Sequence, residues 1–255
     1  CNMIIKTRGI VLGFVKYGET SIICKIYTEE NSIQSFIING IRKSKSKNTA
    51  LYQPLTILDL VIYYKENSGI QRIKEAKLDT IYNSLHRDIK KVSVCYYMSE
   101  FLSKILSSSE THESQFNFIV NSLIAFDNIE NQYSNFHIQF FIKLTKFYGI
   151  DILSSSQLTP SGSEDELSHF IDHCINKNYE VKYNSNKKLR NKVLNLLTEY
   201  YSRHMDINIK LNSTVVLKEI FNWNTMRVLY VYIGLFIIGC SPKKPTEVKE
   251  TEQEL

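Results

Sequence analysis

The chain has 255 residues, of which 43% are hydrophobic, and a formal net charge of +5 at pH 7. No run of about 20 apolar residues is available to span a bilayer, and the five cysteines are too widely spaced to form a CxxC pair. The composition therefore excludes a conventional membrane protein, a disulfide framework and a structural zinc site, and the length allows one large core or two modest ones.

The positive charge is confined to the N-terminal part of the chain. Residues 1–80 carry 12 Lys and Arg against 7 Asp and Glu, and the remaining residues are balanced. The densest point is a short loop in which Arg42, Lys43, Lys45 and Lys47 lie within six residues. Such a loop attracts a polyanion in a salt-sensitive way, although a merely solvated loop has the same composition.

Five runs rich in β-branched and aromatic residues occupy the first 80 positions. We expect strands at 9–17, 21–28, 32–38, 55–64 and 71–78, with the basic loop and Pro54 forming the one long connection. Five strands in about 75 residues match a small closed barrel of the OB type.

After residue 80 the hydrophobic pattern has the period of helices. It predicts helices at 86–107, 116–129, 136–148, 165–176, 188–205 and 213–221, with Gly149 just beyond the end of the third. The fold class is therefore α+β, with a five-stranded OB-type barrel followed by an all-α domain.

Motifs for catalysis are missing from the sequence. It has no phosphate-binding Gly-rich loop, no His-Glu metal helix and no nucleophile motif, so a binding protein without a cofactor is favoured over an enzyme. His169, His173 and Cys174 lie close together, but a helical cysteine beside surface histidines explains them better than a metal site does.

Several segments between residues 3 and 222 resemble a known family. They are Lys6-Thr-Arg-Gly-Ile-Val-Leu12, Lys16-Tyr-Gly-Glu-Thr-Ser21, Ile26-Tyr-Thr-Glu-Glu30, Gly40-Ile-Arg-Lys43, Tyr52-Gln-Pro-Leu-Thr-Ile-Leu-Asp-Leu60, Arg72-Ile-Lys-Glu-Ala76, Asn135-Phe-His-Ile-Gln-Phe140 and Leu217-Lys-Glu-Ile-Phe221. With these segments the chain resembles the bacterial recombination and repair mediators of the RecO family.

The resemblance implies an OB-fold DNA-binding domain at 3–80 and a helical domain at 81–222. It also implies binding of single- and double-stranded DNA, annealing of complementary strands, and a cytoplasmic, nucleoid-associated location without membrane contact for residues 3–222. The implied partners are RecR, the acidic C-terminal tail of single-stranded DNA-binding protein, and the RecA loading pathway. Some relatives carry a four-cysteine zinc motif after the third helix, where this chain has Ser154, Ser155 and Ser156, so no metal is expected.

An OB barrel binds a single strand with cations along the backbone and aromatic platforms under the bases. The candidate phosphate contacts are Arg8, Lys16, Arg42, Lys43, Lys45, Lys47, Arg72 and Lys74. The candidate stacking residues are Tyr17, Tyr27, Tyr52 and Tyr64, and a packing role is an open alternative for each. The cations that could flank a groove for the acidic tail are Arg87, Lys90, Lys91, Lys104, Lys143 and Lys146.

Residues 223–255 differ in character from the rest. The apolar run from Met226 to Cys240 resembles a lipoprotein signal peptide with its lipobox. One hypothesis is that Trp223 stands at a stop codon, that a neighbouring lipoprotein follows, and that Cys1 and Asn2 are upstream sequence; the other is a genuine C-terminal extension. The alternative function is a membrane-tethered basic protein that binds anionic lipid.

Overall fold

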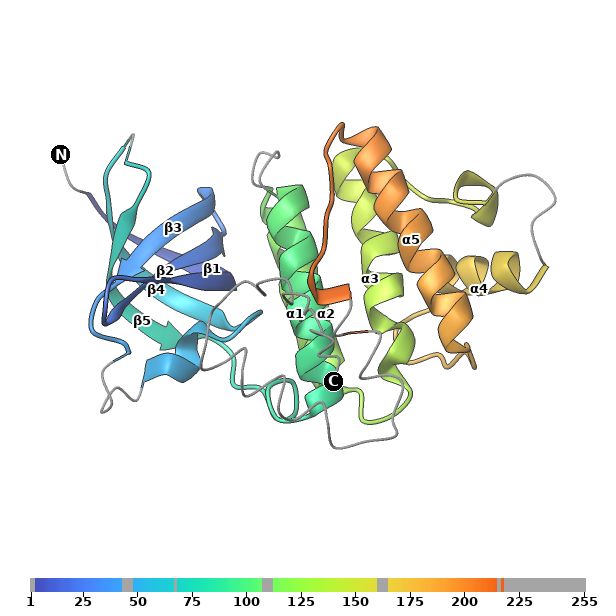
Figure 1. Cartoon of the computed structure of the whole chain (residues 1–255), viewed down its shortest axis with the longest axis horizontal. Helices are drawn as coiled ribbons and strands as arrows, with labels where there is room; N and C mark the ends of the chain where they lie inside the picture. The colour runs from blue at the N-terminus through green and yellow to red at the C-terminus, as the bar shows by residue number, and fades with distance from the viewer. Residues whose placement is uncertain are drawn as a thin grey trace, which may run out of the picture. The chain divides into compact units, whose positions relative to one another are not determined.

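The computed structural model describes residues 3–42, 48–66, 68–106, 112–159, 165–214 and 217 (Figure 1). Three of the predicted DNA contacts, Lys43, Lys45 and Lys47, lie outside the described residues. The lipoprotein-like segment 223–255 lies outside them as well, as does most of the helix expected at 213–221, of which Ser213, Thr214 and Leu217 are helical.

The N-terminal part is a closed barrel of five strands in the order β1-β2-β3-β5-β4. The strands are β1 (Met3–Tyr17), β2 (Ser21–Thr28), β3 (Ser32–Ile38), β4 (Ile57–Tyr64) and β5 (Gln71–Leu78). All neighbours are antiparallel except β3 and β5, which pair in parallel and close the barrel. A 3-10 helix, η1 (Asn48–Tyr52), lies in the connection from β3 to β4. The predicted five-stranded barrel is confirmed.

Strand β1 is longer than the sequence predicts because it pairs with two other strands. Its first half pairs with β4 and its second half with β2. The register shifts between Val11 and Gly13, where Gly13 has a φ of 142° that side chains rarely adopt. At Gly9 a Cβ atom would lie 2.6 Å from Ile26 Cγ2, so this position needs glycine to let the strands close.

The barrel core follows the period of two along β2 and β4. Its buried members are Val11, Ile22, Cys24, Ile26, Phe36, Ile41, Tyr52, Leu58, Leu60 and Ile62. Tyr52 comes from η1 rather than from a strand, so the 3-10 helix contributes an aromatic ring to the barrel core.

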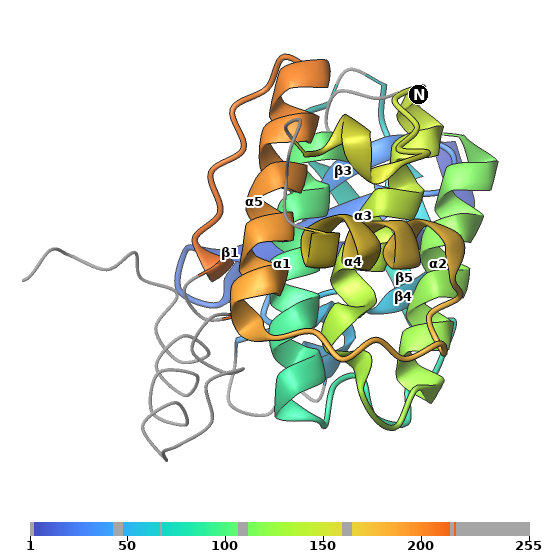
Figure 2. The ribbon, with the colours of Figure 1, turned by 90° about the vertical axis from the view of Figure 1, so that its right-hand side faces the viewer.

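The helices of the second part are α1 (Ile89–Ile105), α2 (Glu113–Asn128), α3 (Phe136–Leu144), α4 (Asp165–Asn176) and α5 (Lys187–His204). Helices α1, α2, α3 and α5 run side by side, and α4 lies across them on the side away from the barrel (Figures 1 and 2). The expected helix 136–148 changes to the 3-10 helix η4 (Thr145–Tyr148) in its last turn and ends, as predicted, at Gly149 with φ 68°.

One buried cluster joins the barrel to the helices. It contains the barrel residues Ile10, Leu12, Tyr27, Leu55 and Ile57 together with the cores of all five helices. The Tyr27 hydroxyl donates to Gln115 Oε1 at 3.1 Å, and its ring lies 5.6 Å from that of Phe116. The outer surface of the barrel around Ile10, Leu12 and Tyr27 therefore packs against α1 and α2.

Within the part of the chain that the structure describes, no helix has both the length and the hydrophobicity needed to cross a membrane.

Candidate nucleic-acid interface

The side chain of Arg8, one of the predicted DNA contacts, forms its hydrogen bonds with other residues of the protein. Its Nη2 donates to Glu29 Oε1 at 2.6 Å and its Nε to Glu29 Oε2 at 3.0 Å, which makes a two-pronged ion pair. Nη2 also donates to Asn117 Oδ1 on α2 at 2.7 Å, and the guanidinium lies 5.1 Å from the centre of the Phe116 ring. The hydrogen bonds to Glu29 raise the pKa of Arg8. A phosphate at Arg8 would have to displace this carboxylate.

The surface around Arg8 carries more acidic than basic side chains. Arg8 faces Asp59 on β4, and Asp59 faces Lys77 on β5. The cavity at this surface has a volume of about 490 Å³, and its charged lining residues are Lys6, Arg8, Glu29, Glu30, Asp59, Glu75 and Lys77. With four carboxylates against three cations, this face does not favour a polyanion.

Lys16 and Arg42 lie at the turn between β1 and β2. The backbone NH of Arg42 donates to Thr20 O at 3.0 Å, and its Nη1 donates to Gly18 O at 3.1 Å. Lys16 pairs with Ile22, the last strand pair but one before the turn of the same hairpin. The structure thus brings these two predicted residues to one end of the barrel, at the point from which the basic loop 43–47 continues.

Arg72 and Lys74 line a groove beside β5, together with Asn39 at the end of β3. The groove has a volume of about 320 Å³. The Asn39 Oδ1 accepts a hydrogen bond from the Ser21 hydroxyl at 3.1 Å, which ties this groove to the β1–β2 turn. Four of the predicted cations, Lys16, Arg42, Arg72 and Lys74, are therefore placed around the β1–β2 turn and the neighbouring seam of β3 and β5, and Arg8 is not.

An apolar row crosses the outside of the barrel and was not predicted from the sequence. Successive register partners on the five strands form this outer row, and they are Val15, Ile23, Ile37, Arg72, Tyr63 and Ile4. Val15, Ile4 and Tyr63 have exposed fractions of 62%, 57% and 39%, respectively. The residues are far apart in sequence, so only the strand register reveals that they adjoin.

The four candidate stacking tyrosines divide by exposure. Tyr27 and Tyr52 are buried, the first against the helices and the second inside the barrel, so packing explains both. Burial raises the pKa of each hydroxyl to about 12. Tyr64 packs against the barrel core and is half-buried, and Tyr17 is exposed next to the outer row. Among the described residues, Tyr17, the unpredicted Tyr63 and Phe14 are aromatic rings exposed on the barrel.

The cations predicted on the helical part include one in the interior. Lys91 is only 1% exposed, and its Nζ donates to Ser84 Oγ at 2.6 Å, Phe126 O at 2.8 Å and Asp127 O at 2.9 Å. Burial lowers the pKa of Lys91. The expectation that it flanks a surface groove is wrong, because its amine joins α1 to the end of α2.

Lys146 lies on an aromatic surface of the helical part. Its Nζ is 5.4 Å from the ring centre of Phe118 and 4.8 Å from that of Phe147, which are cation–π distances. Both rings are half-buried. Lys143, by contrast, donates to the carbonyl of Ile175 at the end of α4.

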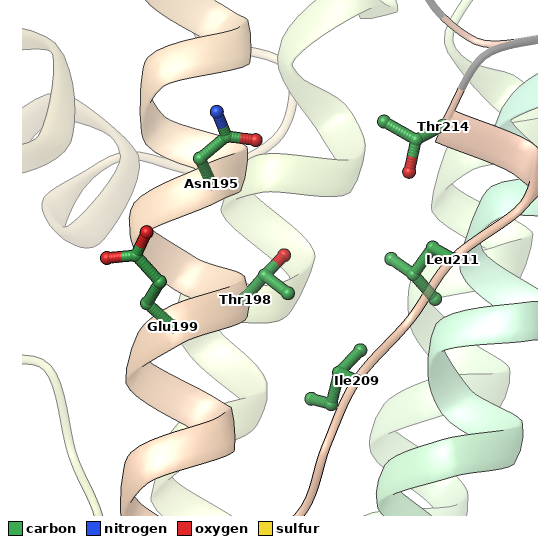
Figure 3. Close-up of a pocket in the computed structure, with 6 residues that line it drawn as sticks. All are labelled: Asn195, Thr198, Glu199, Ile209, Leu211 and Thr214. Atoms are coloured by element: carbon green, nitrogen blue, oxygen red, sulfur yellow. The ribbon is translucent and has the colours of Figure 1, made fainter.

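A hollow on the helical part lies between α5 and the segment that follows it (Figure 3). Its volume is about 200 Å³, and it is lined by Asn195, Thr198, Glu199, Ile209, Leu211 and Thr214. The charged group in this lining is a carboxylate, so the hollow is a poor receptor for an acidic peptide.

The cluster of His169, His173 and Cys174 does not converge on one point. Cys174 is buried in the core, and burial raises the pKa of its thiol. His173 Nε2 is 3.2 Å from Val181 O, and its ring packs on Tyr183. Across the described residues, no three His, Cys, Asp or Glu side chains are grouped to hold a metal ion.

Comparison with known proteins matches both parts of the chain. The family model for the N-terminal part of recombination protein O matches residues 3–82, and the model for its C-terminal part matches residues 86–157. The DNA repair protein RecO of Flavobacterium psychrophilum is 31% identical over 239 residues, which cover 86% of this chain and all of the relative. The RecO proteins of Phocaeicola vulgatus and Bacteroides fragilis (strain ATCC 25285) are 30% and 28% identical, with the same coverage. The chain belongs to the RecO family of DNA repair proteins.

Proposed function

We propose that this protein binds single- and double-stranded DNA at the end of its barrel and anneals complementary strands during DNA repair and recombination. The observation that carries the proposal is the outer row, an apolar and aromatic surface that includes Arg72, with Lys74 on the same strand and Lys16 and Arg42 at the adjoining β1–β2 turn. Single-strand binding requires this combination of cations for the phosphates and flat or apolar surfaces for the bases.

The proposed DNA surface consists of seven of the eight predicted cations. They are Lys16, Arg42, Lys43, Lys45, Lys47, Arg72 and Lys74. Arg8 is left out because its guanidinium is committed to Glu29 and Asn117. Exposed bases would rest on Val15, Tyr17, Ile37 and Tyr63. Annealing then needs no catalytic residue, because the cations reduce the repulsion between two strands held on one surface.

The helical part would meet protein partners. We place the acidic C-terminal tail of single-stranded DNA-binding protein on the surface of Lys146, Phe118 and Phe147, where a cation adjoins two half-buried rings. RecR binding and help in loading RecA complete the proposed role. Substitution Lys146→Glu should weaken binding of an acidic, phenylalanine-ended peptide at least fivefold, and Lys188→Glu on α5 should not.

A strand-annealing assay tests the proposal, with fluorescence anisotropy of a labelled single strand measured beside it. We expect binding that weakens steeply with salt, and annealing that is faster than in the absence of protein. Anionic liposomes provide the comparison: binding to liposomes without binding to DNA would instead support the membrane-tethered alternative. Repeating the annealing with RecR and with DNA coated by single-stranded DNA-binding protein tests the proposed binding of these two protein partners.

A further inference from the structure

The seam between β3 and β5 has the shortest strand pairing in the barrel. These strands pair through only two register positions, Phe36 with Gln71 and Ile37 with Arg72. The buried Gln71 side chain fixes one end of the seam, since its Nε2 donates to Lys65 O at 2.8 Å and its Oε1 accepts from Lys65 N at 2.9 Å. Beyond Ile37 the two strands are no longer paired, and the 320 Å³ groove begins there.

A β-bulge lies in the wall of this groove. Val61 pairs with Glu75 and Ile62 pairs with Ile73, so Lys74 is an extra residue on β5 without a register partner on β4. A bulge re-aims the side chains around it. Here it places Arg72 and Lys74 along the same groove, while Glu75 lines the separate cavity near Arg8.

The lining of the groove combines apolar walls with a cationic rim. The walls are Ile37, Ile38, Leu51, Tyr52, Ile73 and Ala76, and the polar groups are Asn39, Arg72 and Lys74. Acidic residues do not occur among the described residues that line it. The amide of Asn39 is oriented by the Ser21 hydroxyl bound to its Oδ1, so a hydrogen-bonding side chain stands at the mouth.

We infer that this seam is a pocket for one unpaired nucleobase, with the phosphate of that nucleotide on Arg72 and Lys74. The inference rests on the proposed DNA binding and specifies its substrate. Apolar walls suit the faces of a base, and the Asn39 amide suits its polar edge. The volume is near the lower end of small-molecule sites, about 300–1,000 Å³, which accommodates one nucleoside and not a base pair.

The pocket gives the protein a preference for single strands. A base in a duplex must be unstacked and unpaired before it can enter, whereas a base in a single strand enters without breaking a pair. The duplex is then held by the cations alone. A peptide strand that extends β3 is the competing occupant, but the two rim cations favour a polyanion.

Position 76 allows the pocket to be filled without a change of charge. Ala76→Leu places a larger side chain in the groove, and Ala76→Ser is the matched control that keeps it open. The ligands are a thymine oligonucleotide, an abasic strand of the same length, and a blunt duplex. We expect Ala76→Leu to bind the thymine strand about tenfold more weakly than wild type, which is the loss of one stacked base, with the other two affinities unchanged. Ala76→Ser should bind all three as wild type does.

Equal affinity of wild type and Ala76→Leu for the thymine strand would overturn the inference, as would an equal loss for the abasic strand. A peptide occupant gives the first of these results. Photocrosslinking of 4-thiothymidine strands to the wild-type protein decides the matter if Ala76→Leu does not fold: we expect crosslinks within residues 36–42 or 71–78, and crosslinks only elsewhere contradict the pocket. Failure of wild type to bind any of the three DNA ligands would instead refute the proposed function itself.

Discussion

The guanidinium of Arg8 and the carboxylate of Glu29 form a two-pronged ion pair, with nitrogen–oxygen distances of 2.6 and 3.0 Å, and the same guanidinium reaches Asn117 on α2. One side chain of β1 thus connects the β2–β3 turn of the barrel to the helical part. This arrangement assigns Arg8 to holding the two parts together, and it separates Arg8 from the cations around the β3–β5 seam.

Replacing Arg8 by Ala should therefore change stability rather than DNA binding. We expect a loss of about 1–2 kcal/mol in the free energy of unfolding, since charged hydrogen bonds are removed from a partly exposed site. Urea denaturation measures this loss. Lys6→Ala, two residues earlier on the same strand, is the control and should cost less than about 0.5 kcal/mol. If Arg8→Ala retained full stability and reduced the salt dependence of DNA binding, Arg8 would be a phosphate contact.

Lys91 stabilises the connection between the barrel and the helices. Its amine donates to two carbonyl groups at the end of α2, and Asp127 there accepts from the backbone NH groups of Asn83, Ser84 and Leu85 at 2.8 Å each. Burial by itself would raise the pKa of Asp127, but these hydrogen bonds lower it. The buried cation thus closes a network around the linker 79–88.

Substitution Lys91→Met keeps the length of the side chain and removes its three donors. We expect a destabilisation of about 2–4 kcal/mol, because buried carbonyl groups lose their partners. The midpoint of thermal or urea unfolding reports it, with Lys104→Met on the exposed face of α1 as the control. An unchanged midpoint for Lys91→Met would show that these carbonyl groups find other donors.

His137 should make the fold sensitive to mild acid. It is buried in α3 against Tyr97, and burial lowers its pKa to about 3. Because the pKa in the folded state lies below the unfolded value of about 6.5, the stability tied to neutral His137 is fully present above pH 6.5. It is lost progressively as the pH falls from 6.5 toward 3.

The urea midpoint measured from pH 7.5 to pH 4.5 tests this dependence. We expect the midpoint to fall with pH in wild type, and to fall less steeply in His137→Leu whatever the absolute stability of that variant. His112→Ala, at an exposed histidine, should keep the wild-type slope. Parallel slopes for wild type and His137→Leu would assign the acid sensitivity to other groups, such as His86, whose pKa burial also lowers.

The sequence predicts those parts of the fold that depend on local patterns. Strands β2, β3 and β5 and helix α4 have the predicted bounds because alternation or helical spacing and turn residues mark both ends. The start of β4 differs: Leu55 has a positive φ of 64° and lies outside the strand. The first six residues of β1 are strand because β4 pairs with them, from Met3 with Tyr64 to Arg8 with Asp59, and pairing across so long a stretch of chain has no local pattern.

The candidate site is predictable in composition and not in arrangement. The basic residues near 42–47 and 72–74 are visible in the sequence, but the carboxylate that binds Arg8 is 21 residues away and Asn117 is 109 residues away. The outer row likewise depends on the register of five strands. In the sequence, Lys91 cannot be told from the surface lysines near it. Its burial follows from the end of α2, whose carbonyl groups accept its hydrogen bonds.

The salt dependence of duplex DNA binding tests the central proposal, that the barrel end with the basic loop is the DNA surface. The variant replaces Arg42, Lys43, Lys45 and Lys47 by Ala, and the control replaces Lys6 and Lys77 on the face around Arg8. At about 0.9 unit for each phosphate contact, the slope of log K against log salt should decrease in magnitude by up to about four units in the variant and stay at the wild-type value in the control. An unchanged slope in the loop variant, or an equal decrease in the control, would contradict this assignment of the DNA surface.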